Sequence, residues 1–437
     1  MHQPNRRVVI TGIGLISPLG NSPESLWERI SRRESGVGQI KALPEANLPT
    51  RIGGEATEFT GSIENFGELD KMLKRSLKKG LRLMCREIEM GVAASQLALQ
   101  AAGITAESYP PEKIGTLFGS DYILTLPQEF NGGIHKCVND EGEFDMQQWG
   151  ENGIPQVAPL WLLKYLPNMP ASHVAIYNDL RGPSNSLTMR EASSNIAVAE
   201  AVTTIRRGVA DAMLAGATGT RIHPLRSVHV AMQEKLVAND QDPTTACRPF
   251  EKDRTGMVLG EGAACWMLES METAQARSAN ILGEVTGYCT STVANAEGVA
   301  DFEQAIFNVL DGVLQNAGVD ATDVGHVHAH GVSTVECDQA EARAIQRVFG
   351  KAETPVVAAK SYMGNLGAGS GLVEATASLQ AMNHQKLFPI LNYETPDPES
   401  PILAADPEKH SPGNCFVNVN VTPQGQASAM LVSSVEG

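Results

Sequence analysis

The chain lacks paired cysteines. Its 7 cysteines are scattered over 437 residues, and none stands in a CxxC pair. Structural zinc sites usually need such pairs, so we expect no metal and free thiols in a reducing compartment. The cysteines are Cys85, Cys137, Cys247, Cys265, Cys289, Cys337 and Cys415.

Long apolar runs are also missing. No stretch is long and uncharged enough to cross a bilayer. The first predicted strand begins at Arg7, which leaves no room for a signal peptide. We therefore expect a cytoplasmic protein without a transmembrane segment.

Positive charge is scarce. Lys and Arg number 34 against 50 Asp and Glu, which gives a formal net charge of -16. Nucleic acid and anionic membranes attract basic surfaces, so we expect no nucleic-acid partner and no general attraction to membranes. The apolar content of 42% and the charged content of 19% fit a compact globular protein.

Two glycine-rich segments are incomplete as nucleotide-binding motifs. Gly12-Ile13-Gly14 follows the first strand, but the third glycine of a dinucleotide fingerprint is absent and Pro18 prevents a helix from starting at once. The segment Gly364–Gly371 lacks the Lys-Ser/Thr of a P-loop. It therefore predicts a tight backbone passage, and neither segment predicts a nucleotide site.

Short β-rich runs alternate with helical patterns of ten to twenty residues along the chain. This alternation predicts a mixed or parallel sheet flanked by helices. Predicted strands lie at 7–12, 114–119, 210–215, 283–287, 325–329, 356–359 and 416–421, and predicted helices at 88–102, 196–207 and 302–317.

The strand and helix pattern restarts faintly near residue 283. We therefore divide the chain into two similar halves, 1–250 and 251–437, with a turn-rich linker over 239–253. Residues 128–153 are polar and predict an excursion over the surface of the first half.

Several motifs appear in a fixed order. They are the opening VVITGIGLISPLG from Val8 to Gly20, the segment LPNMPASHV from Leu166, the elbow GPSNSLTMRE over 182–191, the segment RPFEKDRTGMVLGEGA from Arg248, the loop HAHGVST over 328–334 and the loop KSYMGNL over 360–366. In this order they closely resemble β-ketoacyl-acyl-carrier-protein synthases of the ketosynthase II type, members of the thiolase superfamily.

The resemblance implies an α/β thiolase fold, layered αβαβα, built from two βαβ-rich halves. It also implies a dimer, an acyl carrier protein as partner, and a substrate carried on phosphopantetheine, with no cofactor held by the chain itself. Fold and activity are separate questions, because one fold supports many functions.

The same resemblance locates a site with three departures. The family's nucleophilic cysteine at the end of the elbow is replaced by Glu191, and its second histidine by Asn365, whereas His330 matches the first histidine. Lys360 matches the supporting lysine and Glu374 a buried glutamate. The C-terminal Gly-Phe-Gly-Gly loop is replaced by the segment 420–425. A carboxylate cannot hold an acyl thioester, so we expect condensation to be lost.

Each of these residues also has a structural interpretation. Glu191 at a helix start favourably meets the positive end of the helix dipole. His330 can satisfy backbone groups, and Lys360 with Glu374 can form a buried pair with no chemical role. Asn365 can donate a hydrogen bond but cannot transfer protons as histidine does.

Basic residues recur at helical spacing between residues 71 and 86. Those proposed to bind the acidic carrier protein are Lys74, Arg75, Lys78, Lys79 and Arg82, within a stripe that runs from Lys71 to Arg86. Apolar residues, among them Met72 and Leu77, are expected on the other side. A solvated basic face, coenzyme A phosphates and anionic lipid headgroups are the alternatives.

Three functions fit this pattern. The first is a non-condensing subunit of fatty-acid or polyketide biosynthesis, similar to chain-length factors, which forms a dimer with itself or with an active ketosynthase. The second is a malonyl-carrier decarboxylase that uses His330. The third is an acyl-processing enzyme in which burial raises the pKa of Glu191 so that it acts as a general base.

Overall fold

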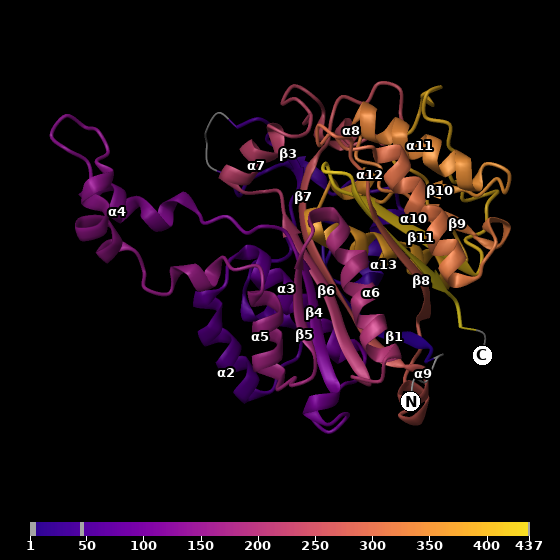
Figure 1. Ribbon diagram of the computed structural model, residues 1–437, viewed down its shortest axis with the longest axis horizontal. Coiled ribbons are helices and arrows are strands. Elements are labelled where there is room, and N and C mark those ends of the chain that lie inside the picture. Colours follow the sequence, from indigo (N-terminus) through magenta and orange to yellow (C-terminus); the bar gives the residue numbers. More distant parts are fainter. Residues whose placement is uncertain (1–5, 44–47, 436–437) are drawn as a thin grey trace.

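A computed structural model describes residues 6–43 and 48–435 of the chain (Figure 1). The described part leaves out residues 1–5 and 436–437, at the ends of the two predicted halves, and the segment 44–47. No helix within the described ranges is long and apolar enough to cross a membrane.

The strands form one continuous sheet in the order β10-β9-β11-β12-β8-β1-β7-β6-β4-β5, with β2 and β3 off this path. Strands of the first half are β1 (Val8–Ile16), β2 (Val37–Gln39), β3 (Ile52–Gly54), β4 (Ile114–Ser120), β5 (Ser184–Thr188), β6 (Ala212–Thr220) and β7 (Leu259–Ser270). Those of the second half are β8 (Gly283–Thr292), β9 (His326–His328), β10 (Val356–Val357), β11 (Cys415–Val421) and β12 (Gln426–Ser433).

The two halves repeat one topology. From the junction outward, the first half runs β1-β7-β6-β4-β5 and the second half runs β8-β12-β11-β9-β10. If β2 and β3 are left out of the count, each half has its first strand at the junction, followed by its last, fourth, second and third strands. Along the described sheet path, the halves join where Val9 and Ile10 pair with Glu284 and Gly283. β7 pairs with β1 and β6, and so belongs to the first half of the sheet, although it follows residue 250.

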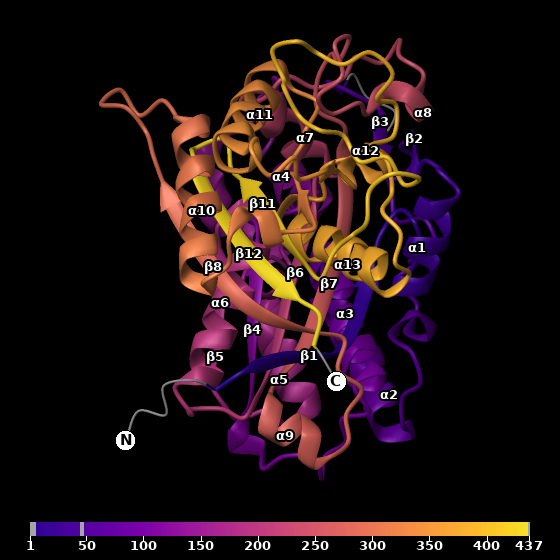
Figure 2. The same ribbon diagram turned by 90° about the vertical axis from the view of Figure 1, so that its right-hand side faces the viewer.

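Helices form three layers, one over the outer face of each half of the sheet and one between the two halves (Figures 1 and 2). The helices α3 (Arg86–Ala101) and α5 (Met169–Asn178) cover the first half, and α10 (Phe302–Ala317) and α11 (Val335–Phe349) cover the second. α6 (Ser193–Arg206) and α13 (Ser370–Asn383) lie between both halves. The remaining helices are α1 (Pro23–Ser31), α2 (Lys71–Gly80), α4 (Asn131–Lys136), α7 (Pro224–Ala231), α8 (Pro243–Ala246), α9 (Met271–Ala276) and α12 (Lys360–Met363). The layered αβαβα arrangement is therefore confirmed.

A long arm, residues 122–168, projects from the first half and carries α4 (Figure 1). It has its own small aromatic core, in which the ring of Phe130 lies 6.2 Å from Trp149 and 5.1 Å from Trp161. The predicted excursion over 128–153 lies within this arm. The surface of the arm is less polar than predicted, because several of its apolar side chains are exposed.

The Gly12-Ile13-Gly14 segment allows α3 to pack closely against β1. A Cβ atom at Gly14 would lie 2.1 Å from the carbonyl oxygen of Ala94, and one at Gly12 would lie 2.6 Å from Ala102 Cβ. These glycines are therefore required by the contact between strand and helix, which explains their presence without a nucleotide.

We predict that Gly14→Ala lowers the free energy of unfolding by about 3 kcal/mol, because the helix backbone cannot move away from the new methyl group without losing contacts elsewhere. Urea unfolding followed by circular dichroism measures the change. Gly38→Ala is the matched control, since a Cβ atom at Gly38 meets nothing within 4 Å. Equal stability of the two variants would contradict the packing argument.

Candidate functional site

The predicted elbow is a strand, a tight turn and a helix. β5 is followed by a single 3-10 turn, Arg190–Ala192, and then by α6. Arg190 adopts a left-handed backbone conformation with φ of 51°, which is uncommon for a residue with a side chain and marks a constrained turn. The turn places Glu191 in the interior, where it is 1% exposed.

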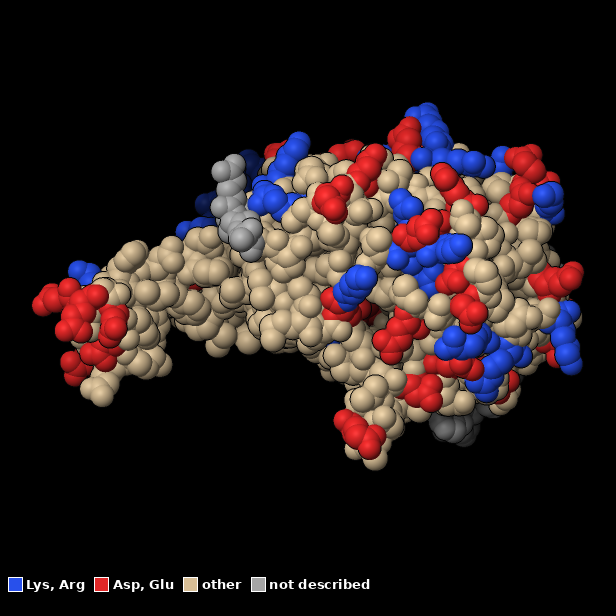
Figure 3. Space-filling model, turned by 90° about the horizontal axis from the view of Figure 1, so that it is seen from above, with Lys and Arg blue, Asp and Glu red and all other residues tan. Residues whose placement is uncertain are grey.

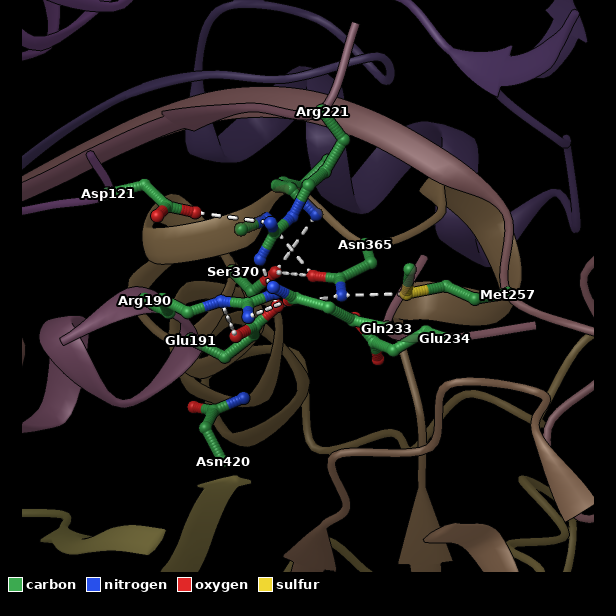
Figure 4. Close-up of polar contacts among 12 residues, drawn as sticks. Asp121, Arg190, Glu191, Arg221, Gln233, Glu234, Met257, Asn365, Ser370 and Asn420 are labelled. Atoms are coloured by element: carbon green, nitrogen blue, oxygen red, sulfur yellow. Dashed lines mark hydrogen bonds and ion pairs between the residues drawn. The ribbon is translucent and has the colours of Figure 1, made fainter. Parts of the chain in front are cut away.

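Two arginines and an amide surround the carboxylate of Glu191 (Figure 4). Arg221 Nη2 forms an ion pair with Glu191 Oε1, and Arg190 Nε lies 3.5 Å from Oε2. Asn365 Nδ2 donates a hydrogen bond of 3.1 Å to Oε1. The carboxylate at the elbow is therefore held by the protein itself.

These contacts belong to a longer chain of alternating charges. Arg221 Nη1 lies 3.2 Å from Asp121 Oδ2, and Arg226 Nη1 lies 3.7 Å from the same oxygen and 2.8 Å from Glu87 Oε1. At the other end, Arg190 Nη2 lies 3.4 Å from Glu234 Oε2. Each charge in this series thus has an opposite charge beside it, and this attraction offsets the cost of burying the charges.

The charges set the protonation of the two carboxyl groups beside Arg190. Burial alone would raise the pKa of Glu191, but Arg221 and Arg190 outweigh it and hold that pKa well below its usual range. Burial, together with the negative charge of Glu191, raises the pKa of Glu234 to about 7. Glu191 is therefore ionised. The lowered pKa argues against the general-base alternative, which required burial to raise the pKa of Glu191.

His330, Lys360 and Glu374 form a second cluster beside the first. His330 Nδ1 lies 3.2 Å from Lys360 Nζ and 3.3 Å from Asn420 Nδ2. Both neighbours are donors, so Nδ1 accepts and Nε2 carries the proton. Burial and the charge of Lys360 lower the pKa of His330 well below its usual value, which keeps the imidazole neutral.

The other members of the second cluster are fixed in the same way. Lys360 Nζ lies 2.5 Å from Glu374 Oε1, and Asn420 Nδ2 donates a hydrogen bond of 2.9 Å to Glu374 Oε2. In the first cluster, Asn365 Oδ1 accepts from Ser370 Oγ at 3.2 Å. All five site residues predicted from the motifs are thus buried in two adjoining clusters.

A cavity of about 480 Å³ opens beside these clusters. His330, Glu234 and Cys337 contribute to its wall, together with Thr422 and Pro423 of the segment 420–425. Glu191 does not line it. Arg190 donates hydrogen bonds to Gln233, which lines the cavity, at 2.6 Å and to Gln424 at 3.3 Å. A ligand in the cavity therefore reaches His330 before Glu191.

Arg221 and Asp121 are site residues that sequence reasoning missed. β4, β5 and β6 are parallel neighbours, so their carboxyl ends meet at one edge of the sheet. Asp121 directly follows β4, and Arg221 directly follows β6. A charged residue immediately after an apolar strand was the available signal, since the site of an α/β sheet lies at that edge.

The basic stripe is only partly as predicted. Lys71, Lys74, Arg75, Lys78, Lys79 and Arg82 are exposed on and just after α2. Arg86 instead turns inward, where its Nη2 lies 2.7 Å from Glu261 Oε1. Met72, expected on the packed side, is 83% exposed because α2 packs mainly through Leu77.

We predict that Glu191→Gln lowers the free energy of unfolding at pH 7 by about 3 kcal/mol, because Arg221 loses its closest counter-charge inside the protein. The folded pKa of Glu191 lies below its ordinary value of 4.5, so the stabilisation is present above that pH and is lost as the pH falls further. Unfolding curves of both proteins from pH 7 to pH 3 should therefore converge at the acidic end.

The control is Glu303→Gln, which removes a carboxylate that pairs with Arg343 and Arg347 at the surface. This change should cost less than about 1 kcal/mol. A difference between wild type and Glu191→Gln that grows on acidification would contradict the assigned ionisation of Glu191.

The chain matches two family models, "Beta-ketoacyl synthase, N-terminal domain" over residues 5–274 and "Beta-ketoacyl synthase, C-terminal domain" over residues 282–394. It is 30% identical over 431 residues to 3-oxoacyl-[acyl-carrier-protein] synthase 2 of Staphylococcus aureus strain COL, covering 98% of each chain. It is also 30% identical over 404 residues to the enzyme of that name from Synechocystis, covering 90% of this chain and 89% of the relative.

Solved structures agree on the fold. A β-ketoacyl synthase from Burkholderia phymatum superposes with a TM-score of 0.84 at 26% identity, covering 99% of this chain and all of the other. The ishigamide ketosynthase/chain length factor gives a TM-score of 0.82 at 23% identity, with the same coverage. The thiolase fold predicted from the motifs is therefore confirmed, and the chain belongs to the β-ketoacyl synthase family.

Proposed function

We propose that the chain is a non-condensing, ketosynthase-like subunit of fatty-acid or polyketide biosynthesis, of the chain-length-factor type. It acts on acyl chains that a carrier protein delivers on phosphopantetheine. The proposal rests on one observation: the position where the family's nucleophile is expected holds an ionised carboxylate paired with Arg221 and Arg190.

The chemistry of the first cluster supports this proposal. The acyl-enzyme step of a condensing enzyme needs a nucleophile that forms a thioester, and Glu191 cannot form one. Asn365, where a second histidine is expected, donates to Glu191 and to the sulfur of Met257 instead. A carboxylate with a lowered pKa is also a weak proton acceptor near neutral pH, which argues against a general-base role for Glu191.

Two exposed surfaces, the edge strand β5 and the basic face of α2, support the proposed partners. β5 is the last strand of the sheet, and its side chains are exposed or half-buried. Such an edge can pair with a second subunit, either another copy or an active ketosynthase. Among the structural neighbours is a type II polyketide acyl-carrier protein in complex with its ketosynthase. The exposed basic residues of α2 are the proposed docking surface for an acidic carrier protein.

Decarboxylation of a malonyl-carrier is a second candidate, favoured by His330. This residue is neutral, lines the cavity, and presents Nε2–H as a donor for a developing enolate oxygen. Asn365 opposes the candidate, because it stands where a second histidine is expected and cannot transfer protons as histidine does.

We expect no elongated product when the purified chain is incubated with an acyl-carrier and a malonyl-carrier, because no thioester can form on it. Intact mass spectrometry of the carrier detects a single elongation, and an active ketosynthase run in parallel shows that the assay works. Glu191→Cys should also fail to elongate, since Asn365 cannot perform the proton transfers of a histidine. Elongation by the wild type would overturn the proposed function.

We also expect malonyl-carrier to retain its mass in the presence of the wild-type chain, as in a sample with no protein added. If acetyl-carrier forms, His330→Ala and Glu191→Ala variants distinguish the origin. Loss of the product in both variants would establish the decarboxylase in place of the non-condensing subunit. Product that persists in both would show a contaminating activity.

A further inference from the structure

The cavity beside the two clusters has a carboxyl group of its own. Glu234 lines the same cavity as His330, and Arg190 holds it in place, with Nη2 3.4 Å from Glu234 Oε2. Glu191, the carboxylate at the elbow, does not line this cavity. A ligand in the cavity therefore meets the carboxyl group of Glu234 and not that of Glu191.

The surroundings of Glu234 make it suitable for proton transfer. The charges that act on it are Glu191 and Arg190 of the elbow, with Arg221 and Asp121 from the ends of β6 and β4. Burial and the negative charge of Glu191 raise the pKa of Glu234, the two arginines lower it, and the balance lies at about 7. Near neutral pH, such a group can accept a proton in one step of a reaction and return it in the next.

His330 supplies the complementary hydrogen-bond donor. Lys360 and Asn420 donate to its Nδ1, so the proton of the neutral ring is on Nε2. An N–H group that is fixed in this way can donate to a carbonyl oxygen. It stabilises the negative charge that develops on that oxygen when the carbonyl carbon is attacked.

The remaining walls of the cavity admit both an acyl chain and water. Phe302, Val421 and Pro423 form an apolar wall, which suits an uncharged acyl chain. Lys235 and Glu336 also line the cavity and are exposed, so the cavity is open to solvent. Its volume of about 480 Å³ lies within the range of small-molecule sites.

We propose that this cavity hydrolyses thioesters of uncharged acyl chains, with Glu234 as general base and His330 as donor to the carbonyl oxygen. Glu234 takes a proton from a water molecule while the water oxygen forms a bond to the carbonyl carbon. The carbon–sulfur bond then breaks, and the proton passes from Glu234 to the departing sulfur. The products are a carboxylic acid and a free thiol, and water is the only co-reactant.

This activity goes beyond the proposed function and does not depend on it. Hydrolysis needs no thioester on Glu191 and no second subunit. A malonyl thioester is a poor substrate for it, because the malonyl carboxylate would lie beside the ionised Glu234 that acts as base. The activity therefore agrees with a malonyl-carrier that keeps its mass.

The test separates the reaction from delivery by a carrier protein. Acidic side chains gather at the tip of the arm (Figure 3), among them Asp140, Glu141 and Glu143. They would repel an acidic carrier, so the substrate used is octanoyl-N-acetylcysteamine, a small neutral thioester that needs no docking surface. Mass spectrometry in water enriched in oxygen-18 detects octanoic acid with one labelled oxygen, which shows that water attacked.

We expect the wild type to form labelled octanoic acid faster than buffer alone. Glu234→Gln should lower the rate about 100-fold, because the base is lost, and His330→Ala should lower it by a similar factor. The matched control is Glu303→Gln, which removes a carboxylate that also pairs with arginine but lies outside the cavity, and it should leave the rate unchanged.

The pH profile distinguishes a base from a structural residue. Between about pH 5.5 and 8.5 the wild-type rate should rise through about pH 7 and then level, because ionised Glu234 is the active form. Glu191→Gln removes a negative charge beside Glu234, so the midpoint should move to lower pH. Circular dichroism at each pH checks that the variants are folded.

No hydrolysis by the wild type, an undiminished rate in Glu234→Gln, or a midpoint that stays in place in Glu191→Gln would overturn the inference. An undiminished rate in His330→Ala would overturn the role of that residue as donor. These results are distinct from those that test the proposed function. Elongation of a carrier-bound chain would refute the non-condensing role and leave hydrolysis standing, whereas absence of hydrolysis leaves the non-condensing role standing.

Discussion

The ion pair between Glu191 and Arg221 is the interaction on which the site depends. A carboxylate that is 1% exposed is costly unless a counter-charge accompanies it. Arg221 in turn is fully buried and needs both Glu191 and Asp121. The three charges come from the ends of β4, β5 and β6, so the parallel arrangement of these strands brings them together. Removing any one of the charges takes away one of the two opposite charges beside its neighbour.

The two clusters divide the site into a closed part and an open part. Glu191 and Asn365 do not line the cavity, and the Asn365 amide donates a hydrogen bond to the Glu191 carboxylate. His330 faces the cavity, and its ring is oriented by Lys360 and Asn420. A ligand in the cavity would therefore contact His330, and Glu191 lies outside its wall.

Local sequence predicted much of this molecule and missed what depends on strand order. The motifs located Glu191, His330 and Asn365 because each stands in a short contiguous segment. Periodicity alone placed α10 at its observed bounds. Arg221 lies thirty residues from Glu191, and the two meet only because β6 is separated from β5 by a single strand. No local pattern contains that information, so the arginine that holds the pKa of Glu191 below its usual range was not predicted.

The chain of charges also connects the elbow to the arm. Asp121 is the residue at which the arm leaves the sheet, and its Oδ2 lies between Arg221 and Arg226. The root of the arm is therefore fixed by the same ions that hold Glu191. Because close charges act on one another strongly in a buried setting, a change at the elbow alters the anchoring of the arm. A substitution at Glu191 is therefore expected to reach beyond the elbow, through Arg221 to Asp121 at the root of the arm.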